Sequence, residues 1–599
     1  MKTNDRIITD LMASVHSGKT QLPDFQRGWV WDDNRIKALI ASITNGYPVG
    51  AAMFLEYGNE NIRFKYRVLE GSPSKGVVPD ELILDGQQRL TSIYASLFSS
   101  EAVNTKTDKG QPIKRYYYID MTKAVDSNVD RLDAILSIPE TKKVTSDFGR
   151  KIEMDVSSAD LEYKQKLFPL NIILDPYKYL NWQFGFMQYY NHDSSASKLF
   201  ADFSKKVIVP MGQYTIPVIT LDRDTPKEAV CQVFENVNTG GVSLTVFELV
   251  TAVFAMDDFE LRKDWENRQK KYFNSDILSV VSATDFLTAC TLLSSFNKKA
   301  SNNSVVSCKK KDVLNLTLDE YKYYKESLSE GFVEAEKILQ EERIFSSKDL
   351  PYTTQLIPMA VLCTLLADNN RIKIASIKDK LKQWYWCGVF GEMYGGANET
   401  RYVYDVVGVM NWLEDSTAIP RTIQESFFNP GRLLSLQSRL SAAYKGVMAL
   451  ILKNHARDFI SGREMDLSAY NEENIDIHHI FPKDHCEKKG YPRPKWNSVV
   501  NKTPISYYTN RVIGGVAPSC YLKKIEDKGQ VTSEKLDTYL ETHFIDVLSC
   551  RADDFNVFFL KRAIVLLNAI EKAMGKAVPG RDSEETIRDF GGSLKRETE

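Results

Sequence analysis

The feature that most limits how this chain can fold is a change in its hydrophobic pattern near residue 245. Before that point, short apolar runs alternate with turns rich in Gly, Pro and Ser. From about 245 to 455 the apolar residues recur at helical spacing, as in LTVFELVTAVFAM, IPMAVLCTLLA and YKGVMALILKNHARDF. A chain of 599 residues also exceeds what one hydrophobic core holds. We therefore expect an α+β multidomain protein, with an α/β domain over 1–250, a helical middle over 251–460 and a third domain over 461–599.

The composition narrows the class of protein. The formal net charge is -2, so any surface that binds a polyanion must be a local patch. The 8 cysteines form no C-x-x-C pair, which argues against a zinc site or a disulfide framework and fits a reducing compartment. The start, MKTNDRIITDLMASVHSGKT, has no signal-peptide core, and no apolar run reaches the length of a membrane span. We expect a soluble cytoplasmic protein.

The stretch LILDGQQRLTS (82–92) predicts a buried strand, a tight glycine turn and a helix. Further strands are expected at RYYYID (115–120) and YTIPVITL (214–221). Near the other end, the amphipathic run FFLKRAIVLLNAIEKAM predicts a helix that stops at Gly575.

The helix after the glycine turn begins with polar donors. A helix N-terminus offers free backbone N–H groups and the positive end of the helix dipole, which suits a phosphate. Side-chain amides and a guanidinium add to these donors at Gln87, Gln88 and Arg89, and a second Gln-Arg pair occurs upstream at Gln26–Arg27. The alternative is a tight turn that polar side chains cap.

Two adjacent histidines stand out in DIHHIFP (476–482), because the chain has only 7 histidines. Hydrolysis of a DNA phosphodiester needs a base that activates water, a divalent cation and a scaffold that holds both. A neutral imidazole suits the first task at pH 7. On an extended strand, which Pro482 would end, His478 and His479 point to opposite faces and should differ in role. The alternative is that the pair is incidental or binds zinc structurally.

The segment that follows the histidines is locally basic. It carries two asparagines, Asn501 and Asn510, whose amide oxygens are possible metal ligands, in NKTPISYYTNRVIG. Only Asp484 and Glu487 are acidic in 482–524. The basic residues of this segment are Lys483, Lys488, Lys489, Arg493, Lys495, Lys502, Arg511, Lys523 and Lys524. Such a local excess of positive charge is typical of a nucleic-acid surface.

D-x-H-H-I-x-P followed by N-x8-N resembles the HNH (ββα-metal) nuclease fold, and more narrowly the C-terminal nuclease domain of GmrSD-type restriction enzymes. The resemblance implies that His479 is the general base and that Asn501 steadies the histidine strand. It implies a divalent metal, Mg²⁺ or Mn²⁺, held by His478 and Asn510, with Asp476 as a further ligand or as an orienting residue. The chain departs from the common pattern because His478 occupies a ligand position that often carries Asp.

The pair of motifs QRGWVW and DGQQRL, together with FENVNTGGVSLTVFEL (234–249), is similar to the N-terminal domain of the same family. That domain has a ParB/sulfiredoxin-like fold, and the family uses it to bind and hydrolyse nucleoside triphosphates. The resemblance therefore implies a nucleotide site, with GTP as the first expectation. Its residues would be Gln26, Arg27, Asp85, Gly86, Gln87, Gln88, Arg89 and Asn238.

Together these motifs predict a nucleotide-regulated, metal-dependent DNA endonuclease with NTPase activity. The family resemblance implies a role in defence, in which the enzyme cuts modified double-stranded DNA of phages. One alternative is a stand-alone NTPase with an inactive nuclease domain. Another is a DNA-binding regulator in the manner of ParB. The helical middle is a candidate homodimer contact, and two nuclease sites in a dimer would turn nicks into double-strand breaks.

Overall fold

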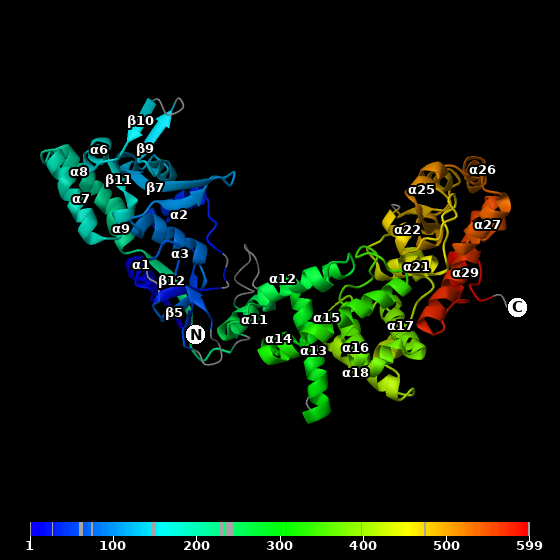
Figure 1. Ribbon diagram of the computed structural model, residues 1–599. Helices are drawn as coiled ribbons and strands as arrows, with labels where there is room; N and C mark the ends of the chain where they lie inside the picture. Colours follow the sequence, from blue (N-terminus) through cyan, green and yellow to red (C-terminus); the bar gives the residue numbers. More distant parts are fainter. Residues whose placement is uncertain are drawn as a thin grey trace. The chain divides into compact units, whose positions relative to one another are not determined.

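The computed structural model describes residues 2–24, 26, 28–58, 64–73, 76–146, 151–226, 229–230, 233, 245–302, 305–396, 398–472 and 475–596. A part that carries strands is followed by a largely helical part (Figure 1), and the first described helix after the change in hydrophobic pattern is α11 (Val246–Phe254). The chain divides into two units, Met1–Leu261 and Arg262–Glu599. The predicted α+β class is confirmed, and the predicted middle and third domains lie almost entirely in the second unit.

A mixed sheet of six strands forms the centre of the N-terminal unit, in the order β1-β12-β3-β5-β2-β4. The strands are β1 (Lys2–Ile7), β2 (Thr20–Pro23), β3 (Ala52–Glu56), β4 (Tyr66–Arg67), β5 (Glu81–Asp85) and β12 (Thr215–Leu221). The pairs β12/β3 and β2/β5 are parallel, and the other pairs are antiparallel. The strands predicted at 82–85 and 214–221 are thus confirmed as β5 and β12. The ParB/sulfiredoxin-like likeness of this unit stays a prediction.

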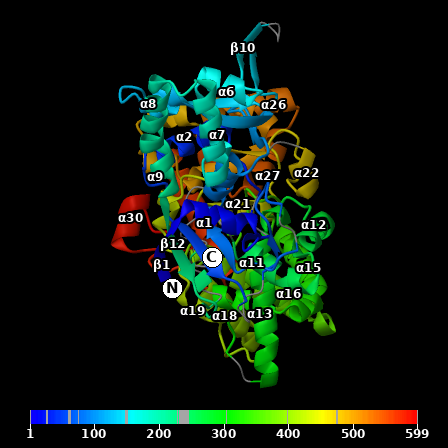
Figure 2. The same cartoon turned by 90° about the vertical axis from the view of Figure 1, so that its left-hand side faces the viewer.

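A second sheet of the N-terminal unit has the order β11-β7-β6, with β8 also paired to β7. Its strands are β6 (Val103–Lys106), β7 (Pro112–Asp120), β8 (Ile135–Pro139) and β11 (Leu167–Pro169), and β7 contains the strand predicted at 115–120. Helices α7 (Pro176–Tyr189) and α8 (Ser194–Phe203) pack beside it through Trp182, Phe186 and Phe200. The hairpin of β9 (Lys143–Ser146) and β10 (Lys151–Asp155) stands out from the unit (Figures 1 and 2).

The helical part is built around α16 (Leu356–Ala367), the predicted helix IPMAVLCTLLA. It is apolar all round and is buried along almost its whole length, because α13 (Ala283–Asn302), α15 (Leu318–Glu341) and α18 (Glu399–Glu414) pack against it. A capping box between Thr317 and Glu320 starts α15. Further along the chain, this part also contains helices α17 (Ala375–Phe390) and α21 (Ala442–Lys453).

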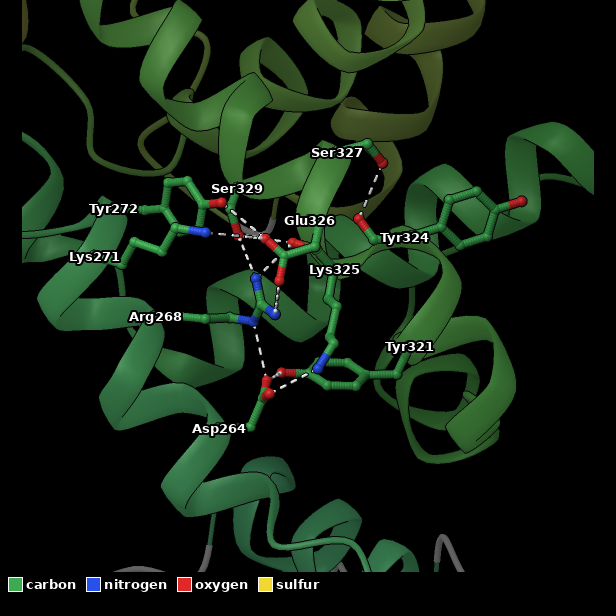
Figure 3. Close-up of polar contacts among 10 residues, drawn as sticks. All are labelled: Asp264, Arg268, Lys271, Tyr272, Tyr321, Tyr324, Lys325, Glu326, Ser327 and Ser329. Carbon is green, nitrogen blue, oxygen red and sulfur yellow. Dashed lines mark hydrogen bonds and ion pairs between the residues drawn. The ribbon is translucent and has the colours of Figure 1, made fainter.

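A cluster of ion pairs fastens α12 (Leu261–Tyr272), the first helix of the C-terminal unit, to α15 (Figure 3). The Arg268 side chain, 5% exposed, donates to Asp264 Oδ2 at 3.0 Å and to Glu326 Oε1 at 2.8 Å. Lys325 and the Tyr321 hydroxyl both donate to Asp264, each at 2.7 Å. The buried guanidinium is therefore neutralised and bonded on several sides, as a buried charge requires.

The C-terminal end of the second unit contains a two-stranded antiparallel sheet, β13 (Ile475–His479) and β14 (Lys502–Ser506). Helix α25 (Tyr507–Ile513) packs against both strands and is followed by α26 (Pro518–Gly529) and α27 (Ser533–Thr542). The long helix α29 (Phe555–Met574) packs against α17 and α21 and ends at Gly575 as predicted, where φ is 60°.

Candidate functional site

Strand β13 carries the histidine motif and places its side chains on alternating faces. Its register pairs His478 with Thr503 and His479 with Lys502. Asp476 and His478 share one face, and His479 points to the other. The strand ends at His479, earlier than expected, and Pro482 instead precedes helix α23 (Lys483–Lys488).

One part of the candidate site contains Asp476, His478 and Asn510. Asn510 lies on α25, and its Nδ2 donates to Asp476 Oδ2 at 2.8 Å. His478 Nε2 is buried and has no hydrogen-bond partner among the described residues. Burial lowers the pKa of His478 to about 4, against the opposing effect of the Asp476 charge. A neutral imidazole is the form in which histidine binds a metal.

These three residues supply one imidazole, one carboxylate and one amide oxygen. Within the described parts of the chain, no group of three or more His, Cys, Asp and Glu side chains could hold a metal ion. Because Asn510 is an amide, the candidate set contains only two such side chains, Asp476 and His478. The donor set fits a divalent cation that accepts both nitrogen and oxygen ligands.

His479 has its own environment on the opposite face of β13. Its Nε2 lies 3.2 Å from Asn497 Oδ1, and its ring packs edge-on against Trp496 with the centroids 5.7 Å apart. Burial lowers the pKa of His479 to about 4, and the nearby Lys502 ammonium acts in the same direction. The ring is therefore neutral at pH 7 and able to accept a proton. The structure thus brings Asn510 to Asp476, whereas the polar partner of His479 is Asn497.

Asn501 fixes the chain that follows the histidine strand. It is fully buried, its Oδ1 accepts from Phe481 N–H at 2.9 Å, and its Nδ2 donates to the carbonyls of Phe481 at 2.9 Å and Trp496 at 2.8 Å. With both ends of its amide used inside the protein, Asn501 positions the backbone and does not reach the surface.

Buried residues far away in sequence support the site, and motif reasoning missed them. Asp458 Oδ2 accepts from Ser506 N–H at 3.0 Å, and its Oδ1 accepts from the Thr509 hydroxyl at 2.8 Å. Burial opposes ionisation of Asp458, but these bonds outweigh it and lower the pKa of the carboxyl. The fully buried Arg562 donates to the carbonyl of Lys502 at 2.9 Å. The sequence feature that could have pointed to Arg562 is its charge inside the apolar run FFLKRAIVLL.

The second candidate site lies where β5 turns into helix α3 (Gln87–Ile93). Gly86 makes the turn with φ at 92°, and a Cβ there would lie 3.2 Å from the Ala52 Cβ, so only glycine fits. The first backbone bond of the helix runs from Leu90 N–H to Gly86 C=O, so the preceding N–H groups point out of its first turn. Arg89 donates to Ala51 C=O at 2.8 Å, to Asp85 Oδ2 at 3.1 Å and to Val49 C=O.

The glutamines of this site also bind the protein itself. Gln26 Nε2 donates to Ile83 C=O at 2.8 Å, while Gln26 Oε1 is buried without a partner among the described residues. Gln88 Oε1 accepts from Val30 N–H at 2.9 Å. Gln87 is buried at the start of α3. The structure therefore gathers the predicted residues at one turn, while Arg27 and Asn238 lie outside the described residues.

Comparison with known proteins finds a likeness in the N-terminal unit. Residues 8–255 match the family described as the GmrSD restriction endonuclease, N-terminal domain. A full-length likeness is to the uncharacterized protein MJ0686 of Methanocaldococcus jannaschii, which is 28% identical over 575 residues, 90% of this chain and 91% of the relative. That alignment is long enough to include parts of both units. Along the described residues, no helix is both long and apolar enough to cross a membrane.

Proposed function

We propose that the protein is a metal-dependent DNA endonuclease of a restriction system and that its N-terminal unit binds a nucleoside triphosphate. The family of residues 8–255 supports the restriction role. The order β13, β14, α25 supports a ββα-metal nuclease unit at the C-terminal end. The observation that carries the proposal is the buried Nε2 of His478, which has no hydrogen-bond partner among the described residues, on the strand that also carries Asp476, the partner of Asn510.

In this proposal different residues bind the metal ion and accept the proton during hydrolysis. Asp476, His478 and the Asn510 amide oxygen would hold a divalent cation, which stabilises negative charge on the phosphate and the leaving oxygen. His479, neutral at pH 7, accepts the proton of the attacking water. Because imidazole is a better ligand for Mn²⁺ than for Mg²⁺, we expect Mn²⁺ to support cleavage at lower concentration.

Exposed basic residues around this unit supply the DNA-binding surface of the proposal. Lys483, Lys488 and Lys489 are exposed on and after α23, and Arg493, Arg511, Lys523 and Lys524 are exposed further along. Lys502 is an exception within the basic segment, because it is buried and donates to Gln437 C=O at 2.7 Å. Phosphate contacts of this kind give affinity that falls steeply with salt.

The nucleotide would bind at the turn between β5 and α3. The start of helix α3 and Gln26 Oε1, which is buried without a partner among the described residues, fit a polar ligand there. Arg89 is occupied by carbonyls of residues 49–51, so its contact with a phosphate requires that this loop releases the guanidinium. GTP is the first nucleotide to test.

Arg89→Ala should weaken triphosphate binding by about 1.5–3 kcal/mol, the cost of one hydrogen bond to a charged group. Isothermal calorimetry with GTP, ATP and CTP measures the affinity. Arg35→Ala is the matched control, since Arg35 is 66% exposed on helix α2 (Asp33–Thr44). Unchanged affinity in the Arg89 variant would remove this residue from the nucleotide site.

The deciding experiment for the function incubates the full chain with modified and unmodified phage DNA, with Mg²⁺ or Mn²⁺, and with each nucleotide in turn. Cleavage that needs the metal, stops with chelator and is lost in His479→Ala supports the endonuclease. Nucleotide turnover without any cleavage would favour an NTPase with an inactive nuclease domain. DNA binding with neither activity would favour a regulator.

A further inference from the structure

A directed chain of hydrogen bonds leads from the helical part of the C-terminal unit to His479. It begins at the carbonyl of Leu434, which accepts from Gln437 Nε2 at 3.3 Å. Gln437 Oε1 in turn accepts from Asn497 Nδ2 at 3.4 Å, and Asn497 Oδ1 lies 3.2 Å from His479 Nε2. A backbone carbonyl can only accept. The direction of every bond in this chain therefore follows from its first member.

The chain determines which nitrogen of His479 carries the proton. The amide oxygen of Asn497 has no hydrogen, so Nε2 must donate to it. A neutral imidazole with its proton on Nε2 has its lone pair on Nδ1. The edge-on contact with Trp496 restricts rotation of the ring. Both the tautomer and the orientation of the imidazole are set.

The segment that carries Gln437 is itself held against β14. Gln437 C=O accepts from Lys502 Nζ at 2.7 Å, and Leu436 C=O accepts from Val499 N–H at 2.8 Å. This segment follows the short helix α20 (Arg432–Ser435) and lies well before residue 461, where the third domain was expected to begin. Part of the site is thus contributed by the helical part.

We propose that Asn497 and Gln437 are positioning residues for His479. They hold the imidazole with its proton on Nε2 and present Nδ1 as the proton acceptor. This inference rests on the proposed nuclease function, but the tautomer itself is a property of the folded chain and is measurable without cleavage.

The first test is kinetic and uses the full-length chain with Mn²⁺ and a cleavable DNA. Asn497→Ala should lower kcat by about 10–100-fold, the usual effect of removing a residue that orients a functional side chain, with KM changed by less than about twofold. Gln437→Ala should act in the same direction with a smaller loss, because Asn497 then keeps one of its two partners. Gln437→Glu keeps the acceptor for Asn497 Nδ2 and should restore most of kcat. Ser438→Ala, an exposed neighbour in the same loop, is the matched control.

The second test is spectroscopic and needs no activity. In chain labelled with ¹⁵N-histidine, the resonances that His479→Gln removes belong to His479 among the 7 histidines. They should show a protonated Nε2 and an unprotonated Nδ1 at pH 7. In Asn497→Ala this preference should weaken.

The outcomes separate the two proposals. A proton on Nδ1 of His479 in the unsubstituted chain would overturn the positioning role, as would a kcat of Asn497→Ala within twofold of the unsubstituted chain. A proton on Nε2 that Asn497→Ala disturbs, in a chain that cleaves no DNA under any metal or nucleotide, would leave the positioning role standing and would count against the nuclease function.

Discussion

Two adjacent histidines lie in separate environments, and this difference has consequences that single substitutions can show. His478, on the face of Asp476, has a ring nitrogen with no hydrogen-bond partner among the described residues, whereas His479 is bonded to Asn497 on the other face. Adjacent residues on a strand point their side chains to opposite faces of the sheet. The proposal of metal binding by His478 and proton transfer by His479 rests on this arrangement.

We predict that His478→Ala weakens Mn²⁺ binding at least about 10-fold, because it removes a direct ligand of the proposed site. His479→Ala should leave Mn²⁺ affinity within about threefold and lower cleavage about 100-fold or more, because the proton acceptor is lost. Calorimetry with Mn²⁺ and a plasmid-cleavage assay measure the two effects. His455→Ala, a change at a side chain that is 70% exposed, is the control. Equal loss of metal binding in both variants would contradict the division of roles.

His543 is buried, contacts Thr503 of β14 and should make the free energy of unfolding depend on pH. Its Nδ1 accepts from the Thr503 hydroxyl at 2.7 Å, its Nε2 donates to Arg457 C=O at 2.9 Å, and burial lowers its pKa to about 4. The unfolded chain takes up a proton below about pH 6.5, whereas the folded chain does not do so until about pH 4. Stability is therefore lost as the pH falls through this window, by about 2 kcal/mol at pH 5 from this residue alone.

Denaturant unfolding at pH 7, 6 and 5 checks this expectation. The His543→Gln variant should be less stable than the unsubstituted chain at pH 7, but its stability should fall less steeply towards pH 5. Parallel pH curves for the two proteins would show that His543 does not cause the dependence.

At the scale of helices and strands, the contact between α12 and α15 depends on the buried guanidinium of Arg268. Arg268 bonds Asp264, Glu326, the Lys325 carbonyl at 3.0 Å and the Ser329 hydroxyl at 3.0 Å (Figure 3). These contacts join the first helix of the C-terminal unit to its longest helix. Loss of the guanidinium would remove these hydrogen bonds together and take the arginine charge away from the Asp264 and Glu326 carboxylates.

We therefore predict that Arg268→Ala lowers the free energy of unfolding of the C-terminal unit by about 2–3 kcal/mol. Lys271→Ala is the matched control on the same helix. Lys271 is 66% exposed and lies 3.8 Å from Glu326, so its loss should lower the stability much less than the loss of Arg268. Thermal unfolding followed by circular dichroism measures both. A similar small loss in the two variants would mean that the cluster contributes little to this contact.

For the whole molecule, the question is which stretch of chain is needed for the C-terminal region with the histidine motif to fold as an independent unit. Asp458, Leu436 and Gln437 all bond to β14 or its flanks, and α29 packs against α17 and α21. A fragment that starts at 461, the predicted start of the third domain, lacks these partners, whereas 262–599 contains them.

We predict that a fragment of residues 262–599 unfolds cooperatively and that a fragment of residues 461–599 has no cooperative transition. Removing the helical part exposes the apolar face of α29 and deprives His543 of the Arg457 carbonyl and Ser506 of the Asp458 carboxylate. Differential scanning calorimetry of both fragments decides this. A transition of 461–599 at the same temperature as the longer fragment would show that residues 461–599 fold by themselves.

Local features of the fold followed from the sequence because they depend on neighbouring residues. The strand before Gly86, the turn at that glycine and the following helix are set by a short apolar run, by a residue free to adopt positive φ and by helical spacing. The apolar run of α16 predicted a buried helix in the same way. The histidine motif also indicated its strand, although the strand is shorter than expected.

The sequence by itself determined the change from a sheet-bearing part to a helical part, the strand–glycine–helix turn at Gly86 and the pairing of chemical groups at 476–479. The tertiary structure alone decided that Gln437 and Asn497, 60 positions apart, orient His479, and that Arg89 is held by the loop at 49–51. The physical reason is the separation along the chain over which each kind of interaction acts. Periodicity and turn chemistry act over a few residues, whereas hydrogen bonds between distant segments form only after the chain has packed.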